Sequence, residues 1–196
     1  MNNSSNHAQT MRLVQTALFM ALIFLLGFTP IGMIPLPFIR VSILCTPVVI
    51  GTLLLGLKPG LLLGFSFGAV SAINAIVAPS ALVATLMAAS PVLAMVMTFA
   101  PRLLVPVVAQ LVYRLVSKGE TAKMRAVPFA AVAGSLTNTV LYLGLMLLFY
   151  VMLGINSEGV LAVIGGTGLI AGTSEAVVAA VIATPILAAL WKVQKQ

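Results

Sequence analysis

The sequence predicts an all-α integral membrane protein with six transmembrane helices and both termini in the cytoplasm. Mean hydropathy is +1.20, and 61% of the 196 residues are hydrophobic whereas only 7% are charged. The apolar runs are too long and too numerous for the core of a soluble domain, and several approach the roughly 20 residues that cross a bilayer. Basic residues also gather in the connections on one predicted side, which sets the orientation.

Six apolar stretches fit single spans. They are residues 12–28, 41–57, 59–78, 101–117, 127–153 and 171–191. Residues 1–10 are predicted to form a polar cytoplasmic leader, and residues 11–196 a single six-helix membrane domain.

Proline and glycine mark the connections in the first half of the chain. The first loop, residues 29–40, contains three prolines and a glycine, which break a helical pattern. The second connection, residues 56–60, begins and ends with glycine and is short. We therefore expect the second and third helices to be antiparallel neighbours.

The second half is harder to divide. Pro101 predicts the start of the fourth helix, because proline favours the first helical turn. Residues 80–100 then form a partly helical external or re-entrant segment broken at Pro91. If that segment were a seventh span, the run that follows Arg102 would be too short to cross alone. Residues 159–191 are too long for one straight span, so the glycines of residues 165–168 are expected to break it.

The distribution of charge supports six spans. Eight of the ten basic residues fall on the predicted cytoplasmic side, and only Arg40 and Arg102 fall outside. This is the positive-inside pattern of a membrane protein. The net charge of +7 therefore reflects topology, and we expect no nucleic-acid partner.

Arg102 is the most informative residue. It follows Pro101 at a predicted helix start, where the helix dipole is already positive and disfavours a cation. Few side chains could neutralise this arginine, because the chain has only three acidic residues, all of them Glu. The arrangement calls for an anion, and we interpret Arg102 as half of a ligand site.

Other polar residues of the predicted spans fall at similar depth. Asn138 and Tyr142 lie one turn apart on one helix, Glu175 lies one turn inside the last, and Asn74 lies near the outer end of the third. Intramembrane polar residues default to a functional hypothesis. The alternative for Arg102 and Glu175 is that they neutralise each other. Asn138 could instead join two helices by a hydrogen bond, Tyr142 could serve helix packing, and Asn74 could be a helix-end residue.

Enzymatic chemistry finds no support. There is no Asp, and the single histidine lies in the polar leader, so His-activated nucleophiles and the usual zinc sites are missing. The glycines of residues 165–168 are not followed by the Lys of a P-loop. We therefore predict no enzyme, no metal site and no cofactor in this chain.

Small residues recur every four positions on three predicted helices. Such stripes let helices approach closely in lipid. On the third and last helices ordinary internal packing explains them. Ala17 and Ala21 lie on the first helix, which has fewer internal neighbours, so an external partner is an equal alternative.

Several short motifs together carry a resemblance. They are Thr16-Ala-Leu-Phe-Met-Ala21, Ile34-Pro-Leu-Pro37, Gly56-Leu-Lys-Pro-Gly60, Pro101-Arg102-Leu-Leu leading into Leu111-Val-Tyr-Arg114, Thr137-Asn-Thr139, and Glu175-Ala-Val-Val-Ala-Ala180. In this order and spacing the chain resembles a substrate-binding S component of an energy-coupling factor (ECF) vitamin transporter, most like the pantothenate type.

The resemblance implies six helices in the bacterial cytoplasmic membrane and a vitamin site in their outer parts, capped by the first loop. Ala17 and Ala21 would dock on a transmembrane coupling subunit (EcfT-like). Two cytoplasmic ATPases (EcfA-like) would bind the ATP. The hydrophobic stretch between the third and fourth helices departs from the family pattern.

Within that family a carboxylate-bearing vitamin suits Arg102, and pantothenate is the leading prediction. Its hydroxyl and amide groups would meet Asn138, Tyr142 and Glu175. A pyrimidine or pyridine vitamin (hydroxymethylpyrimidine or vitamin B6 type) is the nearest alternative, with Glu175 against a ring nitrogen. A stand-alone carrier with Glu175 as its proton site is an alternative of another class.

Overall fold

A computed structural model describes residues 3–29, 32–35, 40–117 and 120–194. Helices dominate these residues, which confirms the all-α class. In chain order the elements are α1 (Asn3–Gly27), β1 (Met33–Pro35), β2 (Arg40–Ser42), α2 (Cys45–Leu55), α3 (Leu57–Val77), α4 (Ala81–Ala89), α5 (Pro91–Val116), α6 (Glu120–Met152), α7 (Glu158–Val163), the π-helical turn η1 (Ile164–Gly168) and α8 (Leu169–Gln194).

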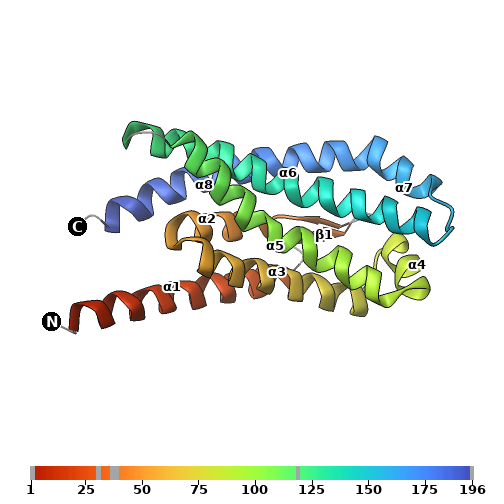
Figure 1. Ribbon diagram of the computed structural model, residues 1–196, viewed down its shortest axis with the longest axis horizontal. Helices are drawn as coiled ribbons and strands as arrows, with labels where there is room; N and C mark the ends of the chain where they lie inside the picture. The colour runs from red at the N-terminus through yellow and green to blue at the C-terminus, as the bar shows by residue number, and fades with distance from the viewer. Residues whose placement is uncertain (1–2, 30–31, 36–39, 118–119, 195–196) are drawn as a thin grey trace.

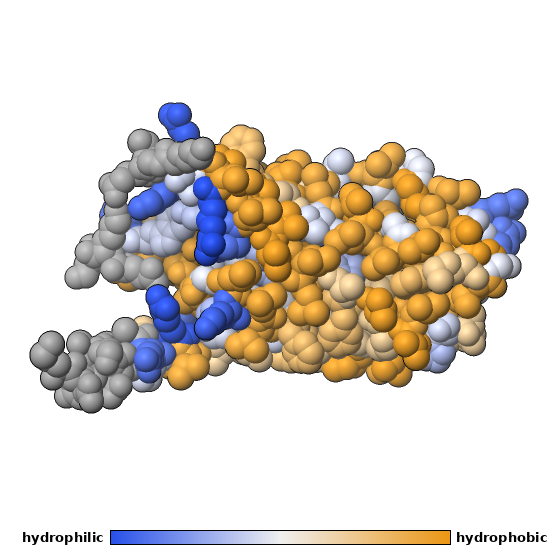
Figure 2. Space-filling model, in the orientation of Figure 1, coloured by the Kyte–Doolittle hydropathy of each residue, from blue (hydrophilic) through white to orange (hydrophobic). Residues whose placement is uncertain are grey.

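The long helices run along one common axis (Figure 1). The start of α1 and the end of α8 lie at one end of the bundle, whereas α4 and α7 lie at the other. Among the described residues, α1, α3, α5, α6 and α8 are long and apolar enough to cross a membrane. Apolar side chains cover the middle of the molecule, as lipid contact requires (Figure 2).

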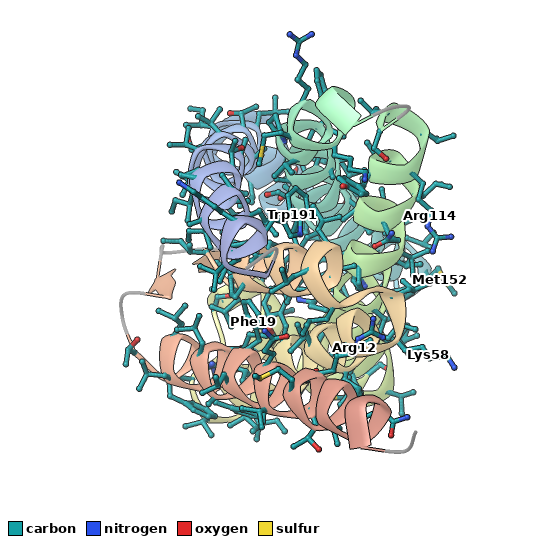
Figure 3. All side chains as sticks on the ribbon, turned by 90° about the vertical axis from the view of Figure 1, so that its left-hand side faces the viewer. Arg12, Phe19, Lys58, Arg114, Met152 and Trp191 are labelled. Carbon is teal, nitrogen blue, oxygen red and sulfur yellow. The ribbon has the colours of Figure 1, made fainter. Side chains whose placement is uncertain are left out.

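Basic side chains gather at the end that holds the chain termini. Arg12, Lys58 and Arg114 lie there, as the view onto that end shows (Figure 3). Trp191 packs against Tyr113 nearby, with ring centroids 6.1 Å apart. Aromatic and basic residues of this kind are typical of a membrane interface.

The second predicted span is shorter than expected. The helix predicted from residue 41 begins only at Cys45, because Arg40–Ser42 is extended and pairs antiparallel with Met33–Pro35. These two strands, the β1–β2 ribbon, give each other the backbone hydrogen bonds that residues 40–42 would otherwise have made within a longer helix. The remaining helix, α2, has 11 residues and is buried along nearly its whole length. Gly56, with φ of 96°, makes the tight turn into α3 that the sequence predicts.

The predicted helix start at Pro101 is wrong. Ser90 and Pro91 begin the helix instead, with the Ser90 hydroxyl accepting from the Leu93 amide, and α5 continues through Pro101 and Pro106. Pro101 has no N–H to give the carbonyl of Met97, four residues earlier. The Arg102 Nη1 donates to that carbonyl at 3.3 Å and replaces the missing bond. Arg102 therefore lies about 16 Å inside α5, and the helix dipole does not act on it.

The other boundaries differ less. α1 begins at Asn3, within the predicted polar leader, and α6 begins at Glu120, before the predicted residue 127. The break predicted at residues 165–168 is a π-helical turn that continues into α8. The prediction that Pro91 interrupts the preceding segment is confirmed, because α4 and α5 meet there.

The two largest hydrophobic clusters of the described residues fill the bundle and leave a polar layer between them. One cluster, which includes Val105, Ala131 and Ala179, lies toward the chain termini. The other, which includes Met97 and Met146, lies toward α4 and α7. Arg102 falls between the clusters along α5. Asn138 and Tyr142 fall between them along α6, so sequence position alone places these side chains in one layer.

The small residues of α3 and α8 serve internal packing, as predicted. A Cβ added at Gly64 would lie 2.7 Å from the backbone oxygen of Arg102, and one at Gly68 would lie 2.7 Å from Phe99. At Gly172 it would lie 2.7 Å from the Thr139 methyl group. Glycine thus brings α3 against α5 and α8 against α6 beside the polar layer.

Candidate ligand-binding site

The polar layer contains two neighbouring cavities. The α3–α5 cavity has about 450 Å³ of empty volume and is lined by α3, the turn into α4, α5 and Tyr142. The α6–α8 cavity has about 400 Å³ and is lined by α5, α6 and the start of α8. Both volumes include space that is open to the surface. Ser42, Arg102 and Tyr142 line both cavities.

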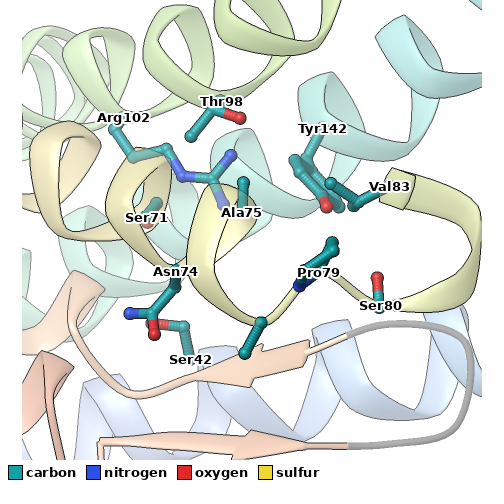
Figure 4. A pocket seen from close by; sticks show the side chains of 11 residues that line it. Ser42, Ser71, Asn74, Ala75, Pro79, Ser80, Val83, Thr98, Arg102 and Tyr142 are labelled. Carbon is teal, nitrogen blue, oxygen red and sulfur yellow. The ribbon is translucent and has the colours of Figure 1, made fainter. Parts of the chain in front are cut away.

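Arg102 lies at the boundary of the two cavities. Its side chain is only 8% exposed, and its guanidinium carbon lies 4.6 Å from the centre of the Tyr142 ring and 5.3 Å from that of Phe67. These are cation–π distances. Figure 4 shows the guanidinium directed into the α3–α5 cavity. The Nε atom is buried and has no hydrogen-bond partner among the described residues.

Glu175 does not neutralise Arg102 by direct pairing. In the described part of the chain its carboxylate accepts from two other groups: the Ser42 amide at 2.5 Å and the Thr139 hydroxyl at 3.5 Å. The Arg102 guanidinium donates to Met97 rather than to a carboxylate. No direct Arg102–Glu175 ion pair therefore forms among the described residues, although the two side chains are near enough to interact electrostatically. Glu175 instead fastens the β1–β2 ribbon to α8.

Asn138 is buried beside these groups, with 5% of its surface exposed. Its Oδ1 has no hydrogen-bond partner among the described residues, so no clamp between helices forms through that atom. A buried unpaired acceptor costs about 1–3 kcal/mol. Together with Tyr142 and Glu175, Asn138 lines the α6–α8 cavity.

Asn74 has a structural contact as well as a place in the cavity wall. Its Nδ2 donates to the Gly27 carbonyl at 3.0 Å and to the Val70 carbonyl at 3.1 Å. The first bond ties the end of α1 to α3. Asn74 also lines the α3–α5 cavity, but not the α6–α8 cavity. Asn74 therefore joins Arg102 and Tyr142 around the α3–α5 cavity, as the sequence predicts. It does not join Asn138 and Glu175 around the α6–α8 cavity.

Several lining residues were not predicted from the sequence. They are Ser42, Ser71, Thr98 and Thr139. Hydroxyl residues are common in membrane helices because they can bond to their own backbone, as Thr98 does with the Ala94 carbonyl. A usable signal existed, because Thr98 lies one turn before Arg102. The assumed helix start at Pro101 concealed it.

Ala17 and Ala21 on α1 line neither cavity, and both are exposed. Large apolar neighbours on the same helix, Leu18 and Leu25, are also exposed. This helix packs mainly against α3 and α2. Its small-residue face is therefore available to lipid or to another subunit.

Comparison with known proteins gives a consistent result. Residues 11–187 match the family model described as "ECF transporter, substrate-specific component". A curated relative is the pantothenic acid transporter PanT of Lactococcus lactis subsp. cremoris (strain MG1363). It is 29% identical over 168 residues, which cover 81% of each chain.

Proposed function

The chain belongs to the substrate-specific components of ECF transporters, and we propose that it captures pantothenate outside the cell for delivery through an ECF energising module. Proteins of this family bind transported substrates and are not enzymes. They work with an energising module of a coupling subunit and ATPases. The similarity to a pantothenic acid transporter supports the choice of vitamin.

The observation that carries the proposal is the buried Arg102 guanidinium. It has no carboxylate partner among the described residues and lies against both cavities. A buried charge is costly unless an opposite charge and hydrogen bonds accompany it. A ligand carboxylate supplies both, because the guanidinium fork matches its two oxygens. This argument needs no contribution from a helix dipole.

The rest of the ligand meets the other polar groups of the layer. Pantothenate carries an amide and hydroxyl groups besides its carboxylate. Asn138 and Glu175 offer acceptors in the α6–α8 cavity, and Tyr142 lies between the two cavities. Asn74 contributes from the α3 side, next to its tether to α1.

In this proposal the protein lies in the bacterial cytoplasmic membrane and crosses it six times. The second span is short and is made by the β1–β2 ribbon together with α2. Both termini lie in the cytoplasm beside the basic residues. The exposed Ala17 and Ala21 dock on the coupling subunit, because small residues allow close helix approach. The cytoplasmic ATPases of the module bind the ATP.

Two measurements test the function. Mass spectrometry of small molecules that co-purify with the detergent-solubilised protein should identify pantothenate. Uptake of labelled pantothenate should require the coupling subunit and the ATPases. Co-purification of a pyrimidine or pyridine vitamin would overturn the choice of substrate. Uptake that persists without the module would instead support a proton-coupled carrier that uses Glu175.

A further inference from the structure

The two cavities differ in chemistry although they share the Arg102–Tyr142 pair. The α6–α8 cavity contains the Glu175 carboxylate. The described lining of the α3–α5 cavity contains serine, threonine and asparagine side chains, and no acidic residue. Figure 4 shows these groups around the Arg102 guanidinium. A ligand with one charged end and one neutral end therefore meets two different environments.

Charge decides which end enters which cavity. A ligand carboxylate placed beside Glu175 would be repelled, and repulsion between like charges is strong where water is excluded. In the α3–α5 cavity the same carboxylate meets Arg102 without that repulsion. The neutral end, which carries hydroxyl or amide groups, then lies in the α6–α8 cavity.

Ser71 provides a second group for the carboxylate. Its side chain is 7% exposed, lines the α3–α5 cavity, and has a buried hydroxyl oxygen that finds no hydrogen-bond partner in the part of the chain that the structure describes. Its neighbour in this lining, Thr98, already donates to the Ala94 carbonyl at 2.8 Å. The Ser71 hydroxyl is therefore an uncommitted donor in the wall that faces the guanidinium.

Asn138 provides the corresponding group for the neutral end of the ligand, in the α6–α8 cavity. Its Oδ1 lies in the lining of the α6–α8 cavity and is buried without a partner from the described residues. An amide oxygen accepts from a hydroxyl or N–H group but not from a carboxylate. This oxygen therefore suits the neutral half of the ligand.

We propose that the ligand lies across the Arg102–Tyr142 pair, with its carboxylate held by Arg102 and Ser71 in the α3–α5 cavity and its hydroxyl-bearing half held by Asn138 in the α6–α8 cavity. This inference rests on the proposed binding of a hydroxylated carboxylate. It assigns Ser71 to recognition of the acid and Asn138 to recognition of the other end.

The test uses calorimetric titration of the full-length protein in detergent with three compounds: pantothenate, its neutral carboxamide, and an analogue without the hydroxyl groups. Ser71→Ala should weaken pantothenate binding roughly 10- to 100-fold, because it removes a hydrogen bond to a charged group. It should leave binding of the carboxamide nearly unchanged. Asn138→Ala should weaken pantothenate and the carboxamide, and should leave binding of the analogue without hydroxyls nearly unchanged.

Ser66→Ala is the matched control. Ser66 is buried on the same helix, its hydroxyl donates to the Leu62 carbonyl, and it lines neither cavity. This variant should bind all three compounds as the wild type does. Should Ser71→Ala not fold, Ser71→Cys keeps the volume with a weaker donor and should show the same selective loss.

The outcomes separate this inference from the proposed function. Wild type that binds pantothenate and its carboxamide equally, or binds neither, would contradict the function itself. Wild type that prefers the acid, with both variants losing affinity for all compounds by the same factor, would overturn the orientation alone. A reversed pattern, with Ser71→Ala sensitive to the hydroxyls and Asn138→Ala to the acid, would also overturn it.

Discussion

The contact between α3 and α5 at Gly64 should be the packing point on which the site depends most. A Cβ at this position would lie 2.7 Å from the Arg102 backbone oxygen and 3.2 Å from the Pro106 ring. Neither neighbour is the end of a flexible side chain, so the two helices must separate. Gly64→Ala should destabilise the protein by about 1–3 kcal/mol, the usual cost of overpacking. The displacement should also weaken ligand binding, because it moves Arg102.

The helix propensity of alanine opposes this loss by about 0.5–1 kcal/mol, so a matched control is needed. Gly144 is a helical glycine on α6, and a Cβ there would meet nothing within 4 Å. Gly144→Ala gains the same propensity without the clash. Thermal unfolding in detergent and calorimetric titration should place Gly64→Ala below Gly144→Ala in both stability and affinity. Equal stability of the two variants would refute the close contact of α3 with α5.

Three further outcomes follow from the described contacts. Ala17→Trp should abolish uptake but leave ligand binding by the isolated protein intact, and a parallel loss of both would make α1 a folding surface. Ligand should slow labelling of Ser42→Cys by a thiol reagent small enough to enter the cavities, since Ser42 is buried but lines both of them, whereas the native Cys45 is buried and lines neither; equal rates with and without ligand would count against ligand binding beside Ser42. Arg102→Met combined with Glu175→Gln should not restore binding, because no ion pair joins the two residues, and restored binding would contradict that geometry.

Hydrophobicity and charge were enough to predict the helical class and the approximate position of most helices. The turn at Gly56 and the interruption at Pro91 were also predicted, since glycine and proline act locally. These features depend on the chain nearby. For this reason they can be recognised without knowledge of the tertiary contacts.

The course of α5 could not be predicted in the same way. Local rules place a helix start at Pro101, but the Arg102 side chain replaces the missing hydrogen bond to Met97, and neighbouring helices surround the proline. Membrane helices tolerate proline when other groups satisfy the freed carbonyl. The wrong helix start singled out Arg102 as important for a physical reason that does not hold. The importance now rests on burial and on the lack of a carboxylate partner.

The roles of single polar residues also depend on tertiary contacts. Glu175 faces the Ser42 amide, and Asn74 faces the Gly27 carbonyl, although both partners are distant in sequence. No spacing rule connects such pairs. Ser71 was missed because one serine in an apolar helix is unremarkable until its hydroxyl is found buried without a partner.

The central claim is that Arg102 binds the carboxylate of the substrate. The most direct test is calorimetric titration of pantothenate and its neutral carboxamide into wild type, Arg102→Ala and Arg102→Lys. Removal of the guanidinium leaves a buried anion unpaired, which should cost about 2–5 kcal/mol, or roughly one and a half to four decades in Kd. Lysine should rescue only in part, because a point charge does not replace the planar fork. The account predicts that wild type strongly prefers the acid and that Arg102→Ala loses this preference. Equal binding of acid and carboxamide by wild type would contradict it.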